Sequence, residues 1–227
     1  MKCKHSFKRA RQPEQIAQRR ADILNAAALL LERDGFDQVS LNGIAREAKI
    51  AKSNVYRYFE SREEIFLQLL KSDWEEWLDK LEKELAEETI DGDVKKLTGI
   101  VSTSIAANPR MCQLVSVLGS VLETNISEDA LVKFKLETIQ IATRMLTLFQ
   151  TCVPAFPMER AYQIVTATTA LIAGLWPLGN PSPVMNKVME RPELAPFKME
   201  FATALERSLT LVFQGAMHEL DNDESNT

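Results

Sequence analysis

Apolar residues recur at helical spacing along most of this chain, in segments separated by Gly, Pro and Asn. In the first segment they return every three to four residues, at Ile16, Ile23, Leu24, Ala27, Leu30 and Leu31. Pro13 suits the first turn of a helix, and Gly35 suits the residue that follows a helix end. The pattern therefore predicts a helix over residues 13–34.

Two short helical segments and a long one follow. Ser40 is a suitable N-cap for a helix over residues 41–48, and Lys49-Ile50-Ala51 forms a turn before a third helix over residues 52–58. Ser61 and Glu64 have the spacing of a capping box, which predicts the start of a long helix that ends near residue 87.

The rest of the chain also predicts helices, over residues 94–107, 109–124, 127–149, 159–178 and 195–220. No strand-like alternation occurs, so the expected fold class is all-α. The most apolar stretch, residues 164–178, is shorter than the roughly 20 residues that a membrane span needs. We expect it to be a buried helix, with no membrane association.

The pattern divides the chain into four parts. We expect a basic flexible arm over residues 1–12, a three-helix helix-turn-helix domain over residues 13–66, a C-terminal helical domain over residues 67–220 and a disordered polar tail over residues 221–227. The helix that begins near Ser61 is long enough to join the two domains without a flexible linker.

Charge is distributed unevenly between these parts. The chain of 227 residues has a net charge of −5, but residues 1–72 hold 14 Lys and Arg against 9 Asp and Glu, a net of +5. The remainder holds 13 against 23, a net of −10. A basic N-terminal part favours a polyanionic partner for that part alone.

Few residues suit catalysis or metal binding. The three cysteines are widely spaced and predict no disulfide framework, which favours a reducing, cytoplasmic compartment. His5 and His218 are the two histidines, and no phosphate-binding loop or hydrolase motif occurs. We therefore expect no enzyme activity, no cofactor and no metal site.

Residues 40–59 combine an apolar back with a polar front, as a helix that enters the DNA major groove requires. Val55 and Phe59 are four residues apart and share the inner face. Lys52 and Arg57 can reach guanine or phosphate, and Asn54 can pair with adenine. The side chains predicted to contact DNA are Ser40, Lys52, Ser53, Asn54, Tyr56, Arg57, Tyr58 and Arg62. A surface helix pair with ordinary charges would show the same spacing.

Residues 19–66 resemble the DNA-binding domain of the TetR family of transcriptional regulators. The most specific part is the YRYF block at 56–59, followed by Ser61 and Glu64. The other matching residues are Ile23, Ala26, Ala27, Leu30, Gly35, Ser40, Ile44, Ala45, Ala48, Ile50 and Ile65. The chain departs from the family pattern at Lys49, where the family usually has Gly, and at Ala51 and Ser53, where it often has Ser and Gly.

The resemblance implies a homodimer that binds a palindromic double-stranded DNA operator and represses transcription until a ligand enters the C-terminal domain. The helices over 159–178 and 195–220 would form the dimer interface, through Ile164, Thr168, Leu171, Leu205, Leu209 and Val212. An intramolecular core would use the same apolar stripes.

We expect a small apolar or amphipathic effector, bound in a pocket between helices that is lined by apolar, aromatic and Met side chains. These are Met111, Leu114, Leu118, Phe134, Met145, Phe149 and Trp176, although each of them also suits a plain core.

Two alternatives stay open at this point. An all-helical protein-interaction module would explain the helices and the acidic body, but not the basic N-terminal part or the block at 56–59. The arm carrying Lys4, Lys8, Arg9 and Arg11 could follow the DNA minor groove, or serve only to raise solubility.

Overall fold

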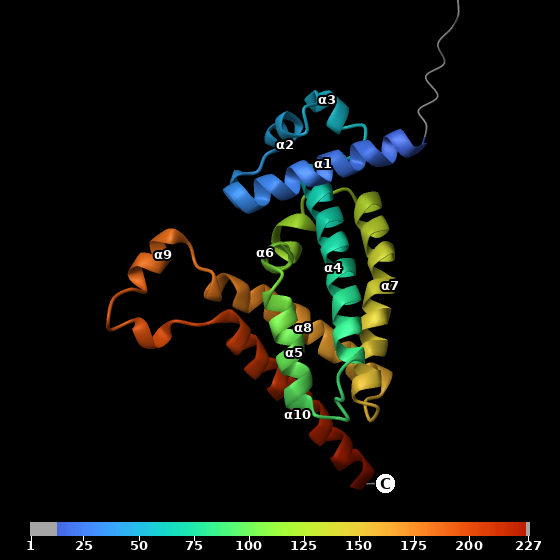
Figure 1. Ribbon diagram of the computed structural model, residues 1–227, viewed down its shortest axis with the longest axis vertical. Coiled ribbons are helices and arrows are strands. Elements are labelled where there is room, and N and C mark those ends of the chain that lie inside the picture. The colour runs from blue at the N-terminus through green and yellow to red at the C-terminus, as the bar shows by residue number, and fades with distance from the viewer. Residues whose placement is uncertain (1–12, 226–227) are drawn as a thin grey trace, which may run out of the picture. The chain divides into compact units, whose positions relative to one another are not determined.

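The computed structural model describes residues 13–225, with side chains through His218 (Figure 1). The described residues form helices and turns, with no strand among them, which confirms the predicted all-α class. They make up two compact units, the first of which ends at Ile65 and the second of which begins at Phe66.

The first unit is a small helical domain built around one long helix. Its elements are α1 (Pro13–Asp34), the 3₁₀ turn η1 (Phe36–Gln38), α2 (Leu41–Glu47) and α3 (Lys52–Val55). Helix α1 packs against α2, and α2 packs against α3. The side chains that fill the space between them are buried and apolar: Ile23, Ala27, Leu30, Leu31, Phe36, Ile44, Ala45, Val55 and Phe59.

Hydrogen bonds at the helix starts follow the sequence prediction. The Ser40 hydroxyl accepts a bond of 3.1 Å from the Gly43 amide, which caps α2. The Ser61 hydroxyl accepts a bond of 3.0 Å from the Glu64 amide, and the Glu64 carboxylate accepts one of 2.6 Å from the Glu60 amide. These two bonds set the start of α4 (Arg62–Ala86).

Helix α3 is shorter than the sequence predicts. It ends at Val55, and the three residues after it form a turn. In this turn the Arg57 amide bonds to the Asn54 carbonyl and the Tyr58 amide to the Val55 carbonyl. Bonds between residues three apart tighten the last turn of a helix and end it.

The second unit consists of the remainder of α4 and the helices that follow it. These are α5 (Val94–Ala106), α6 (Pro109–Ser116), the π-helical turn η2 (Leu118–Leu122), α7 (Glu128–Cys152), α8 (Met158–Gly179), α9 (Pro183–Val188), the 3₁₀ turn η3 (Ala195–Phe197) and α10 (Phe201–Ser225). The predicted Ser127 cap of α7 is present, since its hydroxyl accepts a bond from the Ala130 amide.

Helices α4 and α7 run side by side in this unit (Figure 1). The Trp74 and Phe134 rings stack with centroids 6.2 Å apart, and Arg144 pairs with Glu82 and Asp79. Helix α10 packs against α5 and α8, and the Phe213 ring meets Phe149 edge-on. The core of the unit is therefore continuous from α4 to α10.

Three predicted boundaries in this unit are wrong. The segment 109–124 breaks at Val117, because the amides of Leu122 and Glu123 bond to carbonyls five residues back. Helix α10 starts at Phe201 rather than at residue 195, because the Glu200 carboxylate accepts bonds from the amides of the first turn. It extends past the predicted end at residue 220 to Ser225, and residues 221–225 contain neither Gly nor Pro to stop it.

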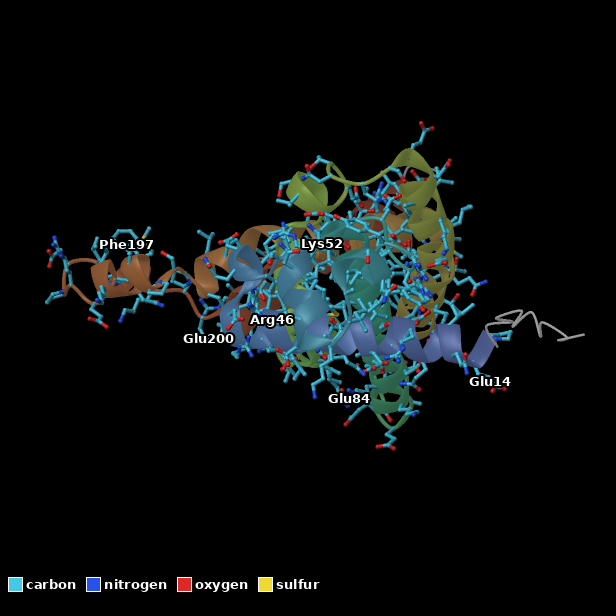
Figure 2. The ribbon with its side chains drawn as sticks, turned by 90° about the horizontal axis from the view of Figure 1, so that it is seen from above. Glu14, Arg46, Lys52, Glu84, Phe197 and Glu200 are labelled. Carbon is cyan, nitrogen blue, oxygen red and sulfur yellow. The ribbon has the colours of Figure 1, made fainter. Side chains whose placement is uncertain are left out.

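Residues 180–200 project from the body of the second unit. Gly179 fixes one end of this segment, since a Cβ there would lie 2.8 Å from the Cβ of Phe201. The Trp176 and Phe201 rings meet edge-on with centroids 5.0 Å apart. The segment between carries exposed apolar side chains, among them Val184 and Phe197, and Figure 2 shows Phe197 far out along it.

Helix α8 is only partly buried, contrary to the prediction for residues 164–178. It has 22 residues and is long and apolar enough to cross a membrane, a test that helices of soluble proteins also pass. Of its most apolar 18-residue window, 22% is buried within the chain. Much of the surface of this apolar helix is therefore not covered by the described part of the chain.

Lys49 adopts a left-handed conformation, with φ of 55°, in the turn between α2 and α3. A residue with a Cβ loses about 1–2 kcal/mol in this region, whereas Gly does not. We expect Lys49→Gly to raise the free energy of unfolding by about 1 kcal/mol, after allowance for the greater freedom of Gly in the unfolded chain.

Chemical denaturation measures this change. Lys49→Ala is the matched control, because it removes the charge but keeps the Cβ. An equal gain in stability for both variants would contradict the conformational explanation.

Candidate nucleic-acid interface and apolar cavity

The exposed face of α3 carries the polar side chains that the sequence predicts. Lys52, Ser53, Asn54 and Arg57 are exposed, as is Tyr56, while Val55 is buried behind them. The Lys52 ammonium lies 5.9 Å from the centre of the Tyr56 ring. The structure thus brings five of the eight predicted DNA-contact residues to the surface of one short helical segment, and Tyr58 is half-buried beside them.

Arg20 holds the end of this segment from α1. Its guanidinium donates a bond of 2.6 Å to the Tyr58 carbonyl and lies 4.3 Å from the centre of the Phe59 ring. Sequence reasoning missed this role, because the two residues are 38 positions apart and no local pattern joins them. The adjacent basic residues Arg19 and Arg20 in α1 were the one sequence feature that pointed to a role for Arg20.

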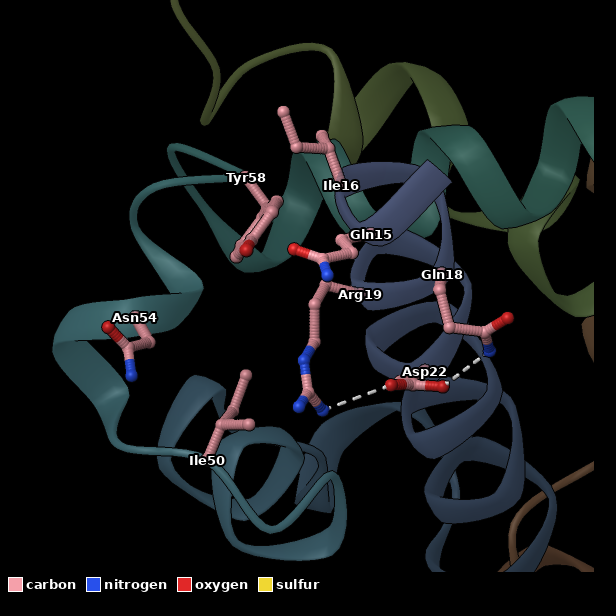
Figure 3. A pocket seen from close by; sticks show the side chains of 8 residues that line it. All are labelled: Gln15, Ile16, Gln18, Arg19, Asp22, Ile50, Asn54 and Tyr58. Atoms are coloured by element: carbon pink, nitrogen blue, oxygen red, sulfur yellow. Dashed lines mark hydrogen bonds and ion pairs between the residues drawn. The ribbon is translucent and has the colours of Figure 1, made fainter. Parts of the chain in front are cut away.

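A polar groove of about 540 Å³ lies between α1 and the α3 segment (Figure 3). On one side Arg19 extends from α1 and bonds to Asp22 at 3.2 Å. On the other side lie Asn54 and Tyr58. The remaining lining residues are Gln15, Ile16, Gln18 and Ile50. Amide and guanidinium groups therefore flank the predicted contact residues, although the sequence did not single them out.

Arg62 has a structural role within the first unit. It donates a bond of 2.8 Å to the Val39 carbonyl, pairs with Glu63 at 2.9 Å and lies over the Phe36 ring. The Ser40 hydroxyl caps α2 but stays exposed. The predicted arm residues Lys4, Lys8, Arg9 and Arg11 lie outside the described residues.

The second unit contains an apolar cavity of about 150 Å³ that is partly open to solvent. It lies between α4, α6, α7 and α8, and is lined by Trp74, Trp77, Met111, Thr138, Ile141, Ala142, Met145, Val165, Thr168, Thr169 and Ile172. Two of the seven predicted ligand residues, Met111 and Met145, line it. A cavity between helices with few polar groups is the usual form of a small-molecule site.

The other five predicted ligand residues lie elsewhere. Leu114 and Phe149 are buried in the core, and Phe134 stacks behind Trp74. Leu118 lies in η2, while Trp176 borders a separate hollow of about 470 Å³ at the base of the projecting segment. The face that a helical residue presents depends on tertiary packing, which the sequence pattern does not specify.

Four of the six predicted interface residues are buried inside the single chain. These are Ile164, Thr168, Leu205 and Leu209, whereas Leu171 and Val212 are half-buried. The four fill the contact between α8, α10 and their neighbours in the same subunit, so they are not available to a partner. The exposed stripes of α8 and α10 consist of other residues, at least one sequence position from these four.

Reactive groups are scarce in the described part of the chain. Burial raises the pKa of the Cys112 thiol to about 12, and its sulfur lies 3.3 Å from the Ile105 carbonyl. Such a thiol stays protonated and unreactive at neutral pH. Within the described residues no group of three His, Cys, Asp or Glu side chains is placed to hold a metal.

Sequence comparison covers both units. Residues 23–69 match the family described as bacterial regulatory proteins, tetR family, and residues 71–219 match the tetracyclin repressor-like C-terminal domain. The chain belongs to the TetR family. This membership favours the DNA-binding interpretation over a protein-interaction module, since the family consists of transcriptional regulators.

Part of the chain is also similar to a bacterial transcriptional regulator. The TetR-family chain is 32% identical over 72 residues to the uncharacterized HTH-type transcriptional regulator YfiR of Bacillus subtilis, which covers 32% of this chain and 35% of YfiR. The match thus spans about a third of that relative's length.

Two solved structures share the fold of this TetR-family chain. FadR of Bacillus halodurans, a fatty acid degradation regulator, has a TM-score of 0.56 at 14% identity, covering 86% of this chain and 98% of that one. FadR of Bacillus subtilis, solved with stearoyl-CoA, has a TM-score of 0.55 at 15% identity, with the same coverage.

Arg20→Ala should destabilise this TetR-family protein by about 2 kcal/mol, because it removes a charged hydrogen bond and a ring contact. Arg19→Ala is the matched control, since Arg19 is exposed and its ion pair contributes at most about 0.5 kcal/mol. Thermal and denaturant unfolding of both variants measure the difference. Equal stabilities would show that Arg20 does not anchor the α3 segment.

Proposed function

We propose that the protein is a ligand-responsive transcriptional repressor that binds a palindromic DNA operator as a homodimer in the cytoplasm. The observation that carries the proposal is the exposed polar face of α3, held on a buried apolar back, in a chain of the TetR family. Side chains of this kind recognise base edges in the major groove.

The proposed DNA contacts are Ser40, Lys52, Ser53, Asn54, Tyr56, Arg57 and Tyr58. Arg62 is left out of this set because its guanidinium bonds to Val39 and Glu63. The groove between α1 and α3 adds Gln15, Gln18 and Arg19 as candidates for contacts to phosphate oxygens, which mainly fix the position of a protein on DNA.

Lys52→Ala and Arg57→Ala should each weaken binding to the specific operator by about 1–3 kcal/mol without lowering the free energy of unfolding. Titrating a promoter-derived palindrome at several salt concentrations measures the effect. Lys133→Ala, an exposed change in α7, is the control and should bind as the unmodified protein does. If a genomic selection recovers no DNA with the unmodified protein, the proposed function is wrong.

A second copy of the chain is the proposed partner of α8 and α10. Residues spaced by four along α8, namely Tyr162, Thr166, Ala170, Gly174 and Leu178, are all exposed. The same holds on α10 for Thr203, Arg207, Leu211 and Gly215. These two stripes include the exposed apolar side chains Tyr162, Leu178 and Leu211, and exposed apolar side chains on adjacent helices are typical of subunit interfaces.

The two glycines in these stripes support close packing between copies. A Cβ added at Gly174 or Gly215 would meet no atom of the same chain within 4 Å. Gly within a helix costs about 1 kcal/mol relative to Ala, so the single subunit gains nothing from them. Glycine at both positions would allow a helix of a second copy to approach the backbone closely.

Gly174→Trp should therefore convert the dimer to a monomer at micromolar concentration while the subunit stays folded. Sedimentation velocity measures the change. Gly119→Trp is the matched control, because Gly119 also has open space around it but lies in η2, outside α8 and α10. If Gly174→Trp sediments as a dimer, this face is not the interface.

The cavity between α4, α6, α7 and α8 is the proposed effector site. Its lining is apolar apart from threonine hydroxyls and tryptophan indole N–H groups, which supports an apolar or amphipathic effector. Helix α4 also begins in the first unit, at Arg62, so the wall that carries Trp74 and Trp77 is continuous with the DNA-binding unit along one helix. This continuity supports regulation of DNA binding by the ligand.

A further inference from the structure

The apolar cavity offers a ligand almost no hydrogen-bond donors. The Thr168 hydroxyl donates to the Ile164 carbonyl at 2.7 Å, and the Thr169 hydroxyl donates to the Val165 carbonyl at 3.1 Å. Thr138 likewise donates to its own helix. The Trp77 indole donates to the Ser104 hydroxyl at 3.0 Å. Among the lining residues, the Trp74 indole is left as the one side-chain donor without a bond within the described chain.

No charged side chain belongs to the lining as the structure describes it. Charged residues flank several lining residues in the sequence without lining the cavity themselves, namely Glu75, Glu76, Glu137, Arg144, Asp73 and Arg110. Asp73 precedes Trp74, and Arg110 precedes Met111. These two neutralise each other through bonds of 3.0 and 2.6 Å, with Asp73 nearly buried. A carboxylate or phosphate buried in the cavity, away from its open side, would lose its hydration and meet a single neutral donor, which does not offset that loss.

The size of the cavity and the chemistry of its walls further restrict the ligands that can bind. About 150 Å³ is half of the roughly 300 Å³ at which sites for drug-sized ligands begin. An engineered apolar cavity of about 150 Å³ in another protein stays dry and binds benzene. Trp74 and Trp77 supply aromatic walls, and Met111 and Met145 supply sulfur atoms that pack well against rings.

We infer that this cavity binds a neutral aromatic molecule of one or two rings in preference to a carboxylate of the same size, and that its volume excludes a long acyl chain such as that of stearoyl-CoA. The inference rests on the proposed function, in which the cavity is the effector site. In this ligand preference the chain would differ from FadR of B. subtilis, which has a similar fold and was solved with stearoyl-CoA.

Calorimetric titration of the full-length protein at neutral pH tests the inference with three probes. These are naphthalene, 2-naphthoate, which carries a carboxylate on the same two rings, and stearoyl-CoA. Naphthalene should bind with one site per subunit, and 2-naphthoate at least tenfold more weakly. Equal or tighter binding of 2-naphthoate or of stearoyl-CoA overturns the inference, as does the absence of naphthalene binding.

A pair of variants locates the bound molecule. Ala142 lines the cavity and is exposed, so it lies at the rim, and Ala142→Phe should weaken naphthalene binding at least tenfold. Gln140→Phe adds the same ring at an exposed position of α7 outside the lining and should bind as the unmodified protein does. Unchanged affinity in Ala142→Phe would place the ligand elsewhere and overturn the inference.

A separate measurement of operator binding distinguishes a failure of the proposed function from a failure of the inference about the ligand. If the unmodified protein binds naphthalene but no DNA, the proposed function fails while the chemistry of the cavity stands. If it binds DNA but not naphthalene, only the inference about the ligand fails.

Discussion

A helix of four residues cannot keep its shape alone, and α3 is such a helix. Its geometry depends on Val55 and Phe59, which are buried against the rest of the first unit, and on the Arg20 guanidinium, which holds the turn that follows. The polar face that would meet DNA is therefore a product of packing behind it. The other helices of the unit have to be in place before the recognition residues can be.

A different constraint governs the second unit, where one helix is more apolar than a single chain can cover. Helix α8 uses Ile164 and Thr168 to pack inside the subunit and leaves a second stripe in contact with solvent. The inner stripe builds one wall of the cavity, and the outer one is suited to another subunit. Subunit association and ligand binding would thus act on opposite sides of the same helix.

Local sequence patterns were sufficient for the longer helices, most of their caps and the exposed polar side chains of α3, but not for the short helix α9. Ser40, Ser61 and Ser127 cap helices as predicted, because a cap is decided by residues two to four positions apart. Tertiary neighbours were not predictable in this way. Nothing local indicates that Trp74 rather than Trp176 lines the cavity, or that Arg62 turns inward to the Val39 carbonyl.

The projecting segment of residues 180–200 leaves and rejoins the second unit at almost the same point, since Gly179 touches Phe201. Its ends are held by that contact and by the ring of Trp176, independently of what lies between them. Lengthening a loop whose ends are already fixed changes the closure entropy only slowly. Insertions and deletions in this segment would leave the packing of α8 against α10 unchanged. The length of the protein can therefore change here during evolution without changes in the core.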